Sequence, residues 1–285
     1  MNPLSSEART LRSLKRLPLV GELDEELWAS LIPHISFETL ETGDTLFSAG
    51  NPSRQLYLVM DGELGLHLEH HGLDSDYFLQ KRKRGDTAGD FAVLNGGEHL
   101  VTAIATRKSR VAAFPHFAFE LLFDINPDIL AHVYDTAARL SRRVMLAKVY
   151  ISLFGTIPTE TMDQLLEGTR INFLQPGESL FSAGDAAEGL HIVVSGRLTV
   201  STTNEQGEKA HVTEVGANET IGEFALLTES RRSMDVHATR ESLVAELDRA
   251  HFDAHIMKDP ERIASLSRII VNRQMKQREI TAHGR

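Results

Sequence analysis

The sequence repeats itself over a long distance, and this repeat limits the possible folds more than any other feature. Residues Leu46–Gly50 recur unchanged as Leu180–Gly184, an offset of 134 residues (184 − 50 = 134). Solenoid repeats have units of about 20–50 residues, whereas a period of this length has the size of a single domain. The sequence therefore predicts two copies of one domain. The same offset relates Gly21 to Gly155, Gly43 to Gly177, Leu56 to Leu190 and Gly62 to Gly196.

Each copy contains short apolar runs separated by turn residues. In the first copy, Leu56–Val59 and Leu64–Leu68 are separated by Asp61-Gly62. Many short strands with regular turn signals are typical of a sandwich or jelly roll. Apolar residues also recur at helical spacing within 128–153, and again from Ile263 onward.

These patterns predict a mainly β protein with flanking α-helices: two tandem jelly-roll (β-roll) domains, each framed by N- and C-terminal helices. The predicted boundaries are a leader at 1–14, a first domain with its connecting helix at 15–150, and a second domain with a C-terminal helix at 151–285. No linker rich in Gly, Pro or Ser separates the copies, so the helix at 128–153 is expected to join them rigidly.

Composition excludes several classes of function. The chain has no cysteine, hence no disulfide and no thiolate metal site, which is compatible with a reducing cytoplasm. No apolar stretch approaches the roughly 20 residues that span a bilayer, so no transmembrane segment is expected. A formal net charge of −10 argues against general nucleic-acid binding, which depends on basic contacts to phosphate.

The segment 222–232 carries the clearest chemical signal. Gly222 allows the backbone to approach a ligand closely, and the residues that follow suit a short helix whose free N–H groups attract an anion. Arg232 supplies a planar, permanently charged fork that suits a phosphate. Glu223 would repel phosphate but accepts hydrogen bonds from sugar hydroxyls. An anion site beside a hydroxyl site predicts a ribose phosphate ligand.

This segment resembles the phosphate-binding cassette of cyclic-nucleotide-binding domains, the family of bacterial catabolite activators, protein kinase A regulatory subunits and cyclic-nucleotide-gated channels. The family pattern is roughly F-G-E-L-A-L, a short variable stretch, R-[AST]-A and V-x-A. Here Ile221 replaces the usual Phe, Met234 the usual Ala, and Arg231 a common Pro.

The resemblance implies a role for each cassette residue. Arg232 would clamp the cyclic phosphate, with further donors from the Ala225 and Ser233 amides and the Ser233 hydroxyl. Glu223 would hold the ribose 2′-hydroxyl, with the Gly222 backbone against the sugar. Phe224 completes the predicted set of ligand-binding residues. Ser233 is compatible with cAMP and cGMP, and cAMP is favoured.

The last helix is expected to close over the base, as it does in the family. The predicted lid lies within Ile269–Gln277, with Ile270 and Arg273 as its candidate contacts. The alternative interpretation of these two residues is an ordinary core position and an ordinary surface position.

The first cassette, Ala88–Leu94, aligns with the second but lacks its key groups. Asp90 stands in place of the ribose glutamate, and His99 in place of the phosphate arginine. Asp is one methylene shorter than Glu, and His lacks the fork and is mostly neutral at pH 7. The first site is therefore predicted to be degenerate.

Comparison with family members narrows the expected role. Catabolite activators carry a DNA-binding helix-turn-helix after the lid helix, and the sequence ends at Arg285, so no DNA binding by that route is expected. Kinase regulatory subunits carry an inhibitor sequence that the leader lacks. Tandem domains also precede the catalytic domain of patatin-like phospholipases of the neuropathy-target-esterase type. A cytoplasmic, non-enzymatic receptor is predicted, with an effector domain or protein and a homodimer left open.

Two other interpretations remain. A cupin-like metalloenzyme would use His67, Glu69 and His71, which share one strand face, although a solvated hairpin end is favoured and no metal is expected. The second interpretation is an interaction scaffold in which both sites are vestigial. The intact Glu223 and Arg232 argue against it. The basic run Lys81–Arg84 is interpreted as a solvated strand end.

Overall fold

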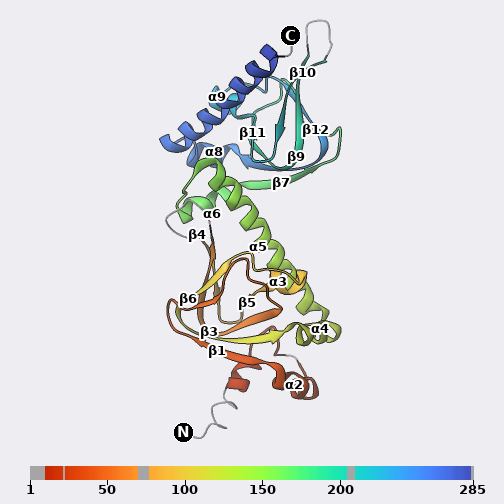
Figure 1. Cartoon of the computed structure of the whole chain (residues 1–285), viewed down its shortest axis with the longest axis vertical. Coiled ribbons are helices and arrows are strands. Elements are labelled where there is room, and N and C mark those ends of the chain that lie inside the picture. Colours follow the sequence, from red (N-terminus) through yellow and green to blue (C-terminus); the bar gives the residue numbers. More distant parts are fainter. Residues whose placement is uncertain (1–9, 22, 70–76, 204–208, 284–285) are drawn as a thin grey trace. The chain divides into compact units, whose positions relative to one another are not determined.

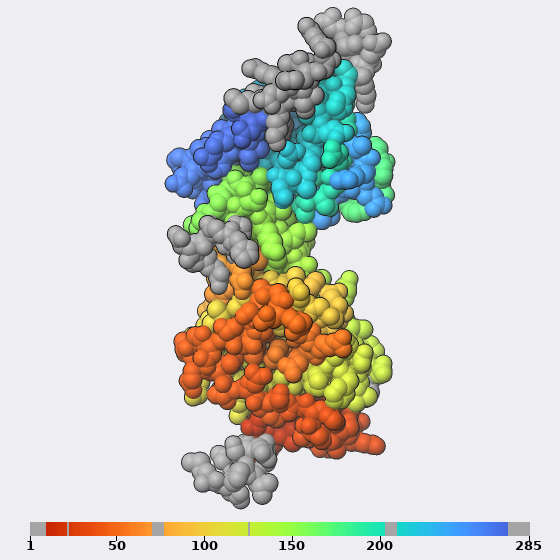
Figure 2. Space-filling model, in the orientation of Figure 1, coloured from red at the N-terminus to blue at the C-terminus, as the bar shows by residue number. Residues whose placement is uncertain are grey.

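The computed structural model describes residues 10–21, 23–69, 77–203 and 209–283. The chain divides into two compact units, Met1–Val144 and Met145–Arg285. Each unit is built on an antiparallel β-sheet that rolls up between helices (Figure 1). Figure 2 shows one face of each unit as a space-filling surface, coloured by residue number. The predicted class, two tandem jelly rolls with flanking helices, is confirmed.

In unit 1, the described residues form a six-stranded sheet of order β1-β6-β3-β4, with β2 paired to β6 and β5 to β3. Helix α5 begins in this unit and ends in the next. The elements in chain order are α2 (Glu25–Leu31), η1 (Ile32–His34), β1 (Ser36–Leu40), β2 (Thr45–Phe47), β3 (Gln55–Leu68), β4 (Tyr77–Lys83), β5 (Thr87–Ala88), α3 (Asp90–Asn95), β6 (Thr102–Pro115), α4 (His116–Ile125) and α5 (Pro127–Phe154).

Unit 2 repeats this plan. Its described residues form a six-stranded sheet of order β10-β9-β12-β7, with β11 paired to β9 and β8 to β12. The elements are α6 (Thr159–Glu167), β7 (Thr169–Leu174), β8 (Ser179–Phe181), β9 (Gly189–Thr203), β10 (Lys209–Gly216), β11 (Thr220–Ile221), α7 (Glu223–Leu227), β12 (Asp235–Asp248), α8 (Arg249–His255) and α9 (Pro260–His283).

The long strands differ from the expected short ones. Strand β3 continues through Asp61-Gly62, which was predicted to be a turn. Gly62 has φ +91°, and a Cβ there would lie 2.2 Å from Ser109 Oγ on β6. The ladder shifts register on both sides of Asp61 instead of ending. Because such irregularities bend a strand without breaking the sheet, one strand can pass from one wall of the roll to the other.

The helices follow the sequence more closely. Helix α5 covers the stretch 128–153 that helical spacing predicted, and α9 begins at Pro260, shortly before the predicted apolar residues from Ile263 onward. Helix α8 begins at Arg249, where the Asp248 side chain caps it by accepting a hydrogen bond from His251 N at 2.9 Å. No helix among the described residues is both long and apolar enough to cross a membrane.

Each unit has its own apolar core. In unit 1, α2 and α4 bury Trp28 and Phe119 against Leu58 and Phe114 of the sheet. In unit 2, the core lies inside the roll and includes Val193, Leu198 and Val236. Each cassette contributes to the core of its own unit: Val93 of α3 belongs to the first core and Ile221 of β11 to the second.

Candidate ligand-binding site

The second cassette is a tight strand-to-helix turn. Strand β11 ends at Ile221, and α7 begins at Glu223 after Gly222, whose φ is +84°. A Cβ on Gly222 would lie 2.1 Å from Arg232 Nη1. This position therefore needs glycine both for its backbone angle and because the arginine passes directly beneath it.

Arg232 is held from several sides. Only 4% of the residue is exposed. Its Nη1 donates to Gly222 O and its Nη2 to Gly189 O, each at 2.7 Å. The guanidinium lies 4.4 Å from the centre of the Phe181 ring. Its Nε is buried and has no hydrogen-bond partner within the described part of the chain. The arginine is thus oriented before any ligand arrives, with donor capacity remaining.

Burial and neighbouring charged groups shift the pKa values of Arg232 and of the adjacent His191. Burial lowers the pKa of the guanidinium, while the carboxylates of Glu246 and Glu223 act in the opposite direction. Beside it, burial and then the charge of Arg232 lower the pKa of His191 to about 3. His191 is therefore neutral at pH 7, and Arg232 is the group that offers positive charge here.

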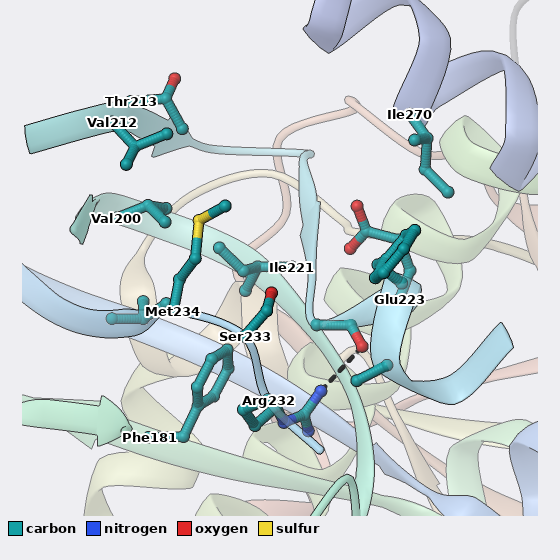
Figure 3. Close-up of a pocket in the computed structure, with 14 residues that line it drawn as sticks. Phe181, Val200, Val212, Thr213, Ile221, Glu223, Arg232, Ser233, Met234 and Ile270 are labelled. Atoms are coloured by element: carbon teal, nitrogen blue, oxygen red, sulfur yellow. Dashed lines mark hydrogen bonds between the residues drawn. The ribbon is translucent and has the colours of Figure 1, made fainter. Parts of the chain in front are cut away.

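A cavity of about 330 Å³ opens against Arg232 and Glu223 (Figure 3). The structure brings all the predicted ligand-binding residues to this one cavity, together with Ile270 from α9. The side chain of Arg273 lies outside the described residues. The cavity is lined by Phe181, Val200, Val212, Thr213, Ile221, Gly222, Glu223, Phe224, Ala225, Arg232, Ser233, Met234, Val236 and Ile270.

Sequence reasoning missed the wall opposite Glu223. Phe181, Val200, Val212 and Thr213 come from β8, β9 and β10, far from the cassette in sequence. One signal for Phe181 was available, because it belongs to the segment that recurs unchanged in both copies. The others form part of an ordinary strand alternation, which does not indicate which face lines a cavity.

The equivalent place in unit 1 has the same backbone but almost no space. His99 N donates to Asn51 O, as Arg232 N donates to Asp185 O in unit 2. The imidazole of His99 stacks on Phe47 with ring centres 3.7 Å apart, and burial lowers its pKa to about 4. The remaining cavity measures about 10 Å³, and Leu140 of α5 is part of its lining.

Asp90, in place of the ribose glutamate, faces inward to protein groups. It is 1% exposed and accepts a hydrogen bond from the Thr87 hydroxyl. Burial raises its pKa, and the positive charge of Arg82 acts in the opposite direction. Arg82 stands where unit 2 has the buried Val215 (215 − 82 = 133, the offset from Gly89 to Gly222). The interpretation of Lys81–Arg84 as a solvated strand end is therefore wrong for Arg82, which is half-buried, has its Nε and Nη2 atoms buried, and acts through its charge on Asp90 of the cassette.

The histidine-rich segment gives no metal site in the described part of the chain. Within it, no group of three or more His, Asp or Glu side chains is arranged to hold a metal ion. His67 packs against the ring of Phe78, with centres 5.5 Å apart, and Glu69 accepts a hydrogen bond from Thr102. His71 lies outside the described residues.

Comparison with known proteins agrees with the repeat. The family model described as "Cyclic nucleotide-binding domain" matches residues 37–126 and 171–259. The two matches begin 134 residues apart (171 − 37 = 134), the offset found in the sequence.

Among curated proteins, the chain is 29% identical over 236 residues to lysophospholipase NTE1 of Candida albicans, covering 80% of this chain. It is 30% identical over 217 residues to lysophospholipase NTE1 of Cryptococcus neoformans, covering 76% of this chain. The chain spans only 16% and 12% of the lengths of these two relatives.

Among solved structures, it is similar to the regulatory domain of Toxoplasma gondii PKA, crystallised with cAMP. The identity is 20%, the coverage is 95% of this chain and 97% of the other, and the TM-score is 0.42. The two matched regions of the family model together exceed half of the chain. The chain therefore belongs to the cyclic nucleotide-binding domain family, with one copy of the domain in each unit.

Proposed function

We propose that the second domain binds a cyclic nucleotide, with cAMP favoured over cGMP, and that the chain is a regulatory receptor without catalytic activity. The observation that carries the proposal is a buried arginine at the end of an open cavity. Burying a charge is costly unless an opposite charge or several hydrogen bonds compensate. Arg232 keeps a buried Nε without a hydrogen-bond partner among the described residues, and a phosphate in the cavity would use it.

The roles of the cassette residues follow from the chemistry of their groups. Arg232 binds the cyclic phosphate through charge-assisted hydrogen bonds, helped by the Ala225 and Ser233 amides. Glu223, which is 5% exposed and lines the same cavity, accepts hydrogen bonds from the ribose hydroxyl. Phe224 and Ile270 stand at the cavity lining where the last helix approaches.

The first domain is proposed to bind no nucleotide. A neutral His99 cannot replace an arginine, and Asp90 already faces Thr87 and Arg82. The cavity of about 10 Å³ is far below the roughly 300–1,000 Å³ of ligand pockets. One binding site per chain is expected.

Output is proposed to reach an effector domain or partner protein. The curated relatives named lysophospholipase are much longer than this chain, which matches 16% and 12% of their lengths. A regulatory part of a lipid-hydrolysing enzyme is therefore one effector context that these relatives support.

Calorimetric titration with cAMP and with cGMP tests the proposal. We expect one site per chain, and Arg232→Ala should weaken binding by about 2–5 kcal/mol, the usual cost of removing one partner of a buried charged hydrogen bond. This corresponds to a loss of roughly 30-fold to several thousand-fold.

Arg231→Ala is the matched control. Arg231 is the adjacent arginine, and it is exposed and donates to Gly184 O at 2.7 Å. Its removal should leave binding nearly unchanged, with both variants checked by thermal unfolding. Two equivalent sites per chain, or a larger loss for Arg231→Ala, would contradict the proposed site.

A further inference from the structure

The cavity in unit 2 has two chemically different ends. Arg232 and Glu223 form a polar end beside Gly222. Val200, Val212 and Met234 form an apolar end, and Figure 3 shows the Met234 side chain extending past Ile221 toward both valines. If the phosphate and ribose occupy the polar end, the base must enter the space that Met234 borders. This inference rests on the proposed function and deepens it.

Met234 occupies room that the cassette pattern leaves open. The resemblance places a small alanine at this position, and methionine is much longer. The cavity volume of about 330 Å³ is already close to the lower end of the usual range of roughly 300–1,000 Å³. Met234 is half-buried and packs against the apolar cluster that contains Val200 and Ile221. The room available to a base therefore depends on where this side chain lies.

The same position faces the cavity in both copies. Val101 of unit 1 corresponds to Met234 (234 − 101 = 133, the offset between the two cassettes). It is 2% exposed and lines the small remaining cavity there. Equivalent backbone positions in the two units thus place different apolar side chains, Met234 and Val101, at the lining of their cavities. The fold therefore directs this side chain toward the cavity, whichever residue stands there.

Hydrogen bonding offers little selection at this end of the cavity. Thr213 is a polar lining residue there, but its hydroxyl donates to Glu214 O at 3.3 Å, and in Figure 3 its oxygen points away from Met234. Among the described lining residues outside the polar end, the other side chain with a polar group that can hydrogen-bond is the exposed Ser233, through its hydroxyl. Selection among bases must therefore depend chiefly on size and shape.

We propose that Met234 is a specificity-determining residue of this site, which sets the size of base that the second domain accepts. Its unbranched thioether fills irregular gaps and adapts to its neighbours. An unsubstituted purine fits once the side chain folds against Val200 and Val212. A bulky group on the purine meets the side chain, because Met234 borders this end of the cavity together with Val200 and Val212.

The test compares wild type, Met234→Ala and Met234→Leu in the full chain. Each is titrated with cAMP and with cAMP analogues that carry a bulky apolar group at C2, N6 or C8. Steric limits in apolar pockets are worth about 10-fold or more for each group accommodated. In Met234→Ala, at least one analogue should gain 10-fold or more in affinity relative to cAMP. Met234→Leu, of similar volume, should keep the wild-type ratios.

The possible outcomes separate this inference from the proposed function. If wild type binds cAMP but Met234→Ala leaves every analogue-to-cAMP ratio unchanged, Met234 does not set the size of the base. If Met234→Leu relaxes the ratios as much as Met234→Ala, bulk at this position is not the determinant. If neither the wild type nor any variant binds a cyclic nucleotide, the proposed function fails and this inference fails with it. Should Met234→Ala fail to fold, Met234→Phe provides the opposite test, with cAMP affinity expected to fall 10-fold or more.

Discussion

At the scale of single residues, the site depends on how Gly222 and Arg232 fit together. The glycine carbonyl accepts a hydrogen bond from the arginine, and the missing side chain leaves room for the guanidinium. The sequence identified both residues as ligand-binding candidates, from their residue types and the family resemblance, but it did not predict the contact between them. It did not indicate that the arginine would also be bound to Gly189 O and stacked over Phe181, because those partners come from distant strands.

Gly222→Ala should reduce nucleotide affinity as strongly as loss of the arginine itself. The new Cβ would lie 2.1 Å from Nη1 and displace the guanidinium. Gly177→Ala is the matched control, because Gly177 has a similar φ of +85° and nothing within 4 Å of its Cβ position. Both variants carry the backbone strain, so similar thermal stability with different affinity is the expected result. Equal affinities would show that the contact is unimportant.

At the scale of elements, the helices that follow the two rolls meet their cavities differently. In unit 1, the buried Leu140 of α5 lines a cavity of about 10 Å³. In unit 2, the half-buried Ile270 of α9 lines a cavity of about 330 Å³. The sequence predicted both helices, since helical periodicity is a local signal. The family resemblance, not periodicity, named Ile270 as a candidate lid contact. The long bent strands could not be predicted in the same way, because a glycine inside a strand resembles a turn until its partner strand is known.

Ile270→Ala should weaken cAMP binding roughly 5- to 30-fold, the effect of losing most of the burial of one aliphatic side chain. Val271→Ala is the neighbouring control, because Val271 is 46% exposed and does not line the cavity. A ligand shifts a conformational equilibrium only through contacts that differ between the states.

Hydrogen exchange on the intact protein measures whether this contact is coupled to movement. Nucleotide should slow exchange in 220–235 and in 262–278 of wild type. In Ile270→Ala, protection of the second segment should be reduced more than that of the first. Protection of the cassette alone in wild type would show that the domain binds without moving α9.

At the scale of the whole molecule, the two copies share a dependence on buried neutral histidine. His99 in unit 1 and His191 in unit 2 lie at non-equivalent positions of the duplicated fold, and each is 5% exposed. Burial lowers the pKa of His99 to about 4 and that of His191 to about 3. The sequence identified His99 as standing in place of the phosphate arginine, but it gave no sign of His191, whose ring lies 5.4 Å from that of Phe181, centre to centre.

Both domains should lose stability as the pH falls below about 6.5. Unfolded histidine, with a pKa near 6.5, takes up a proton there, whereas the folded residues do so only near pH 4 and pH 3. The stabilisation is therefore complete above pH 6.5 and is lost toward the folded values, at up to about 1.4 kcal/mol per pH unit for each histidine.

Urea unfolding at pH 7, 6 and 5 measures this loss. His191→Gln should flatten the pH dependence of the second domain, because the titrating group is removed. His211→Gln, at an exposed position, is the control and should keep the wild-type slope. An unchanged slope in His191→Gln would remove this histidine as the cause.

The filled cavity of unit 1 also bears on how such a chain can change over evolutionary time. Replacing Asp90 with Glu and His99 with Arg would restore the cassette sequence at these two positions, yet the charge of Arg82 would still act on the carboxylate, and Leu140 would still line a cavity of about 10 Å³. Neither of these two substitutions is expected to restore nucleotide binding unless the changes at Arg82 and Leu140 are already present. Once the packing of a duplicated domain closes in this way, single mutations offer no path of gradual improvement back to binding. Under the proposed function, the first copy would then be kept by selection on its folding, and the second alone would be under selection for its ligand.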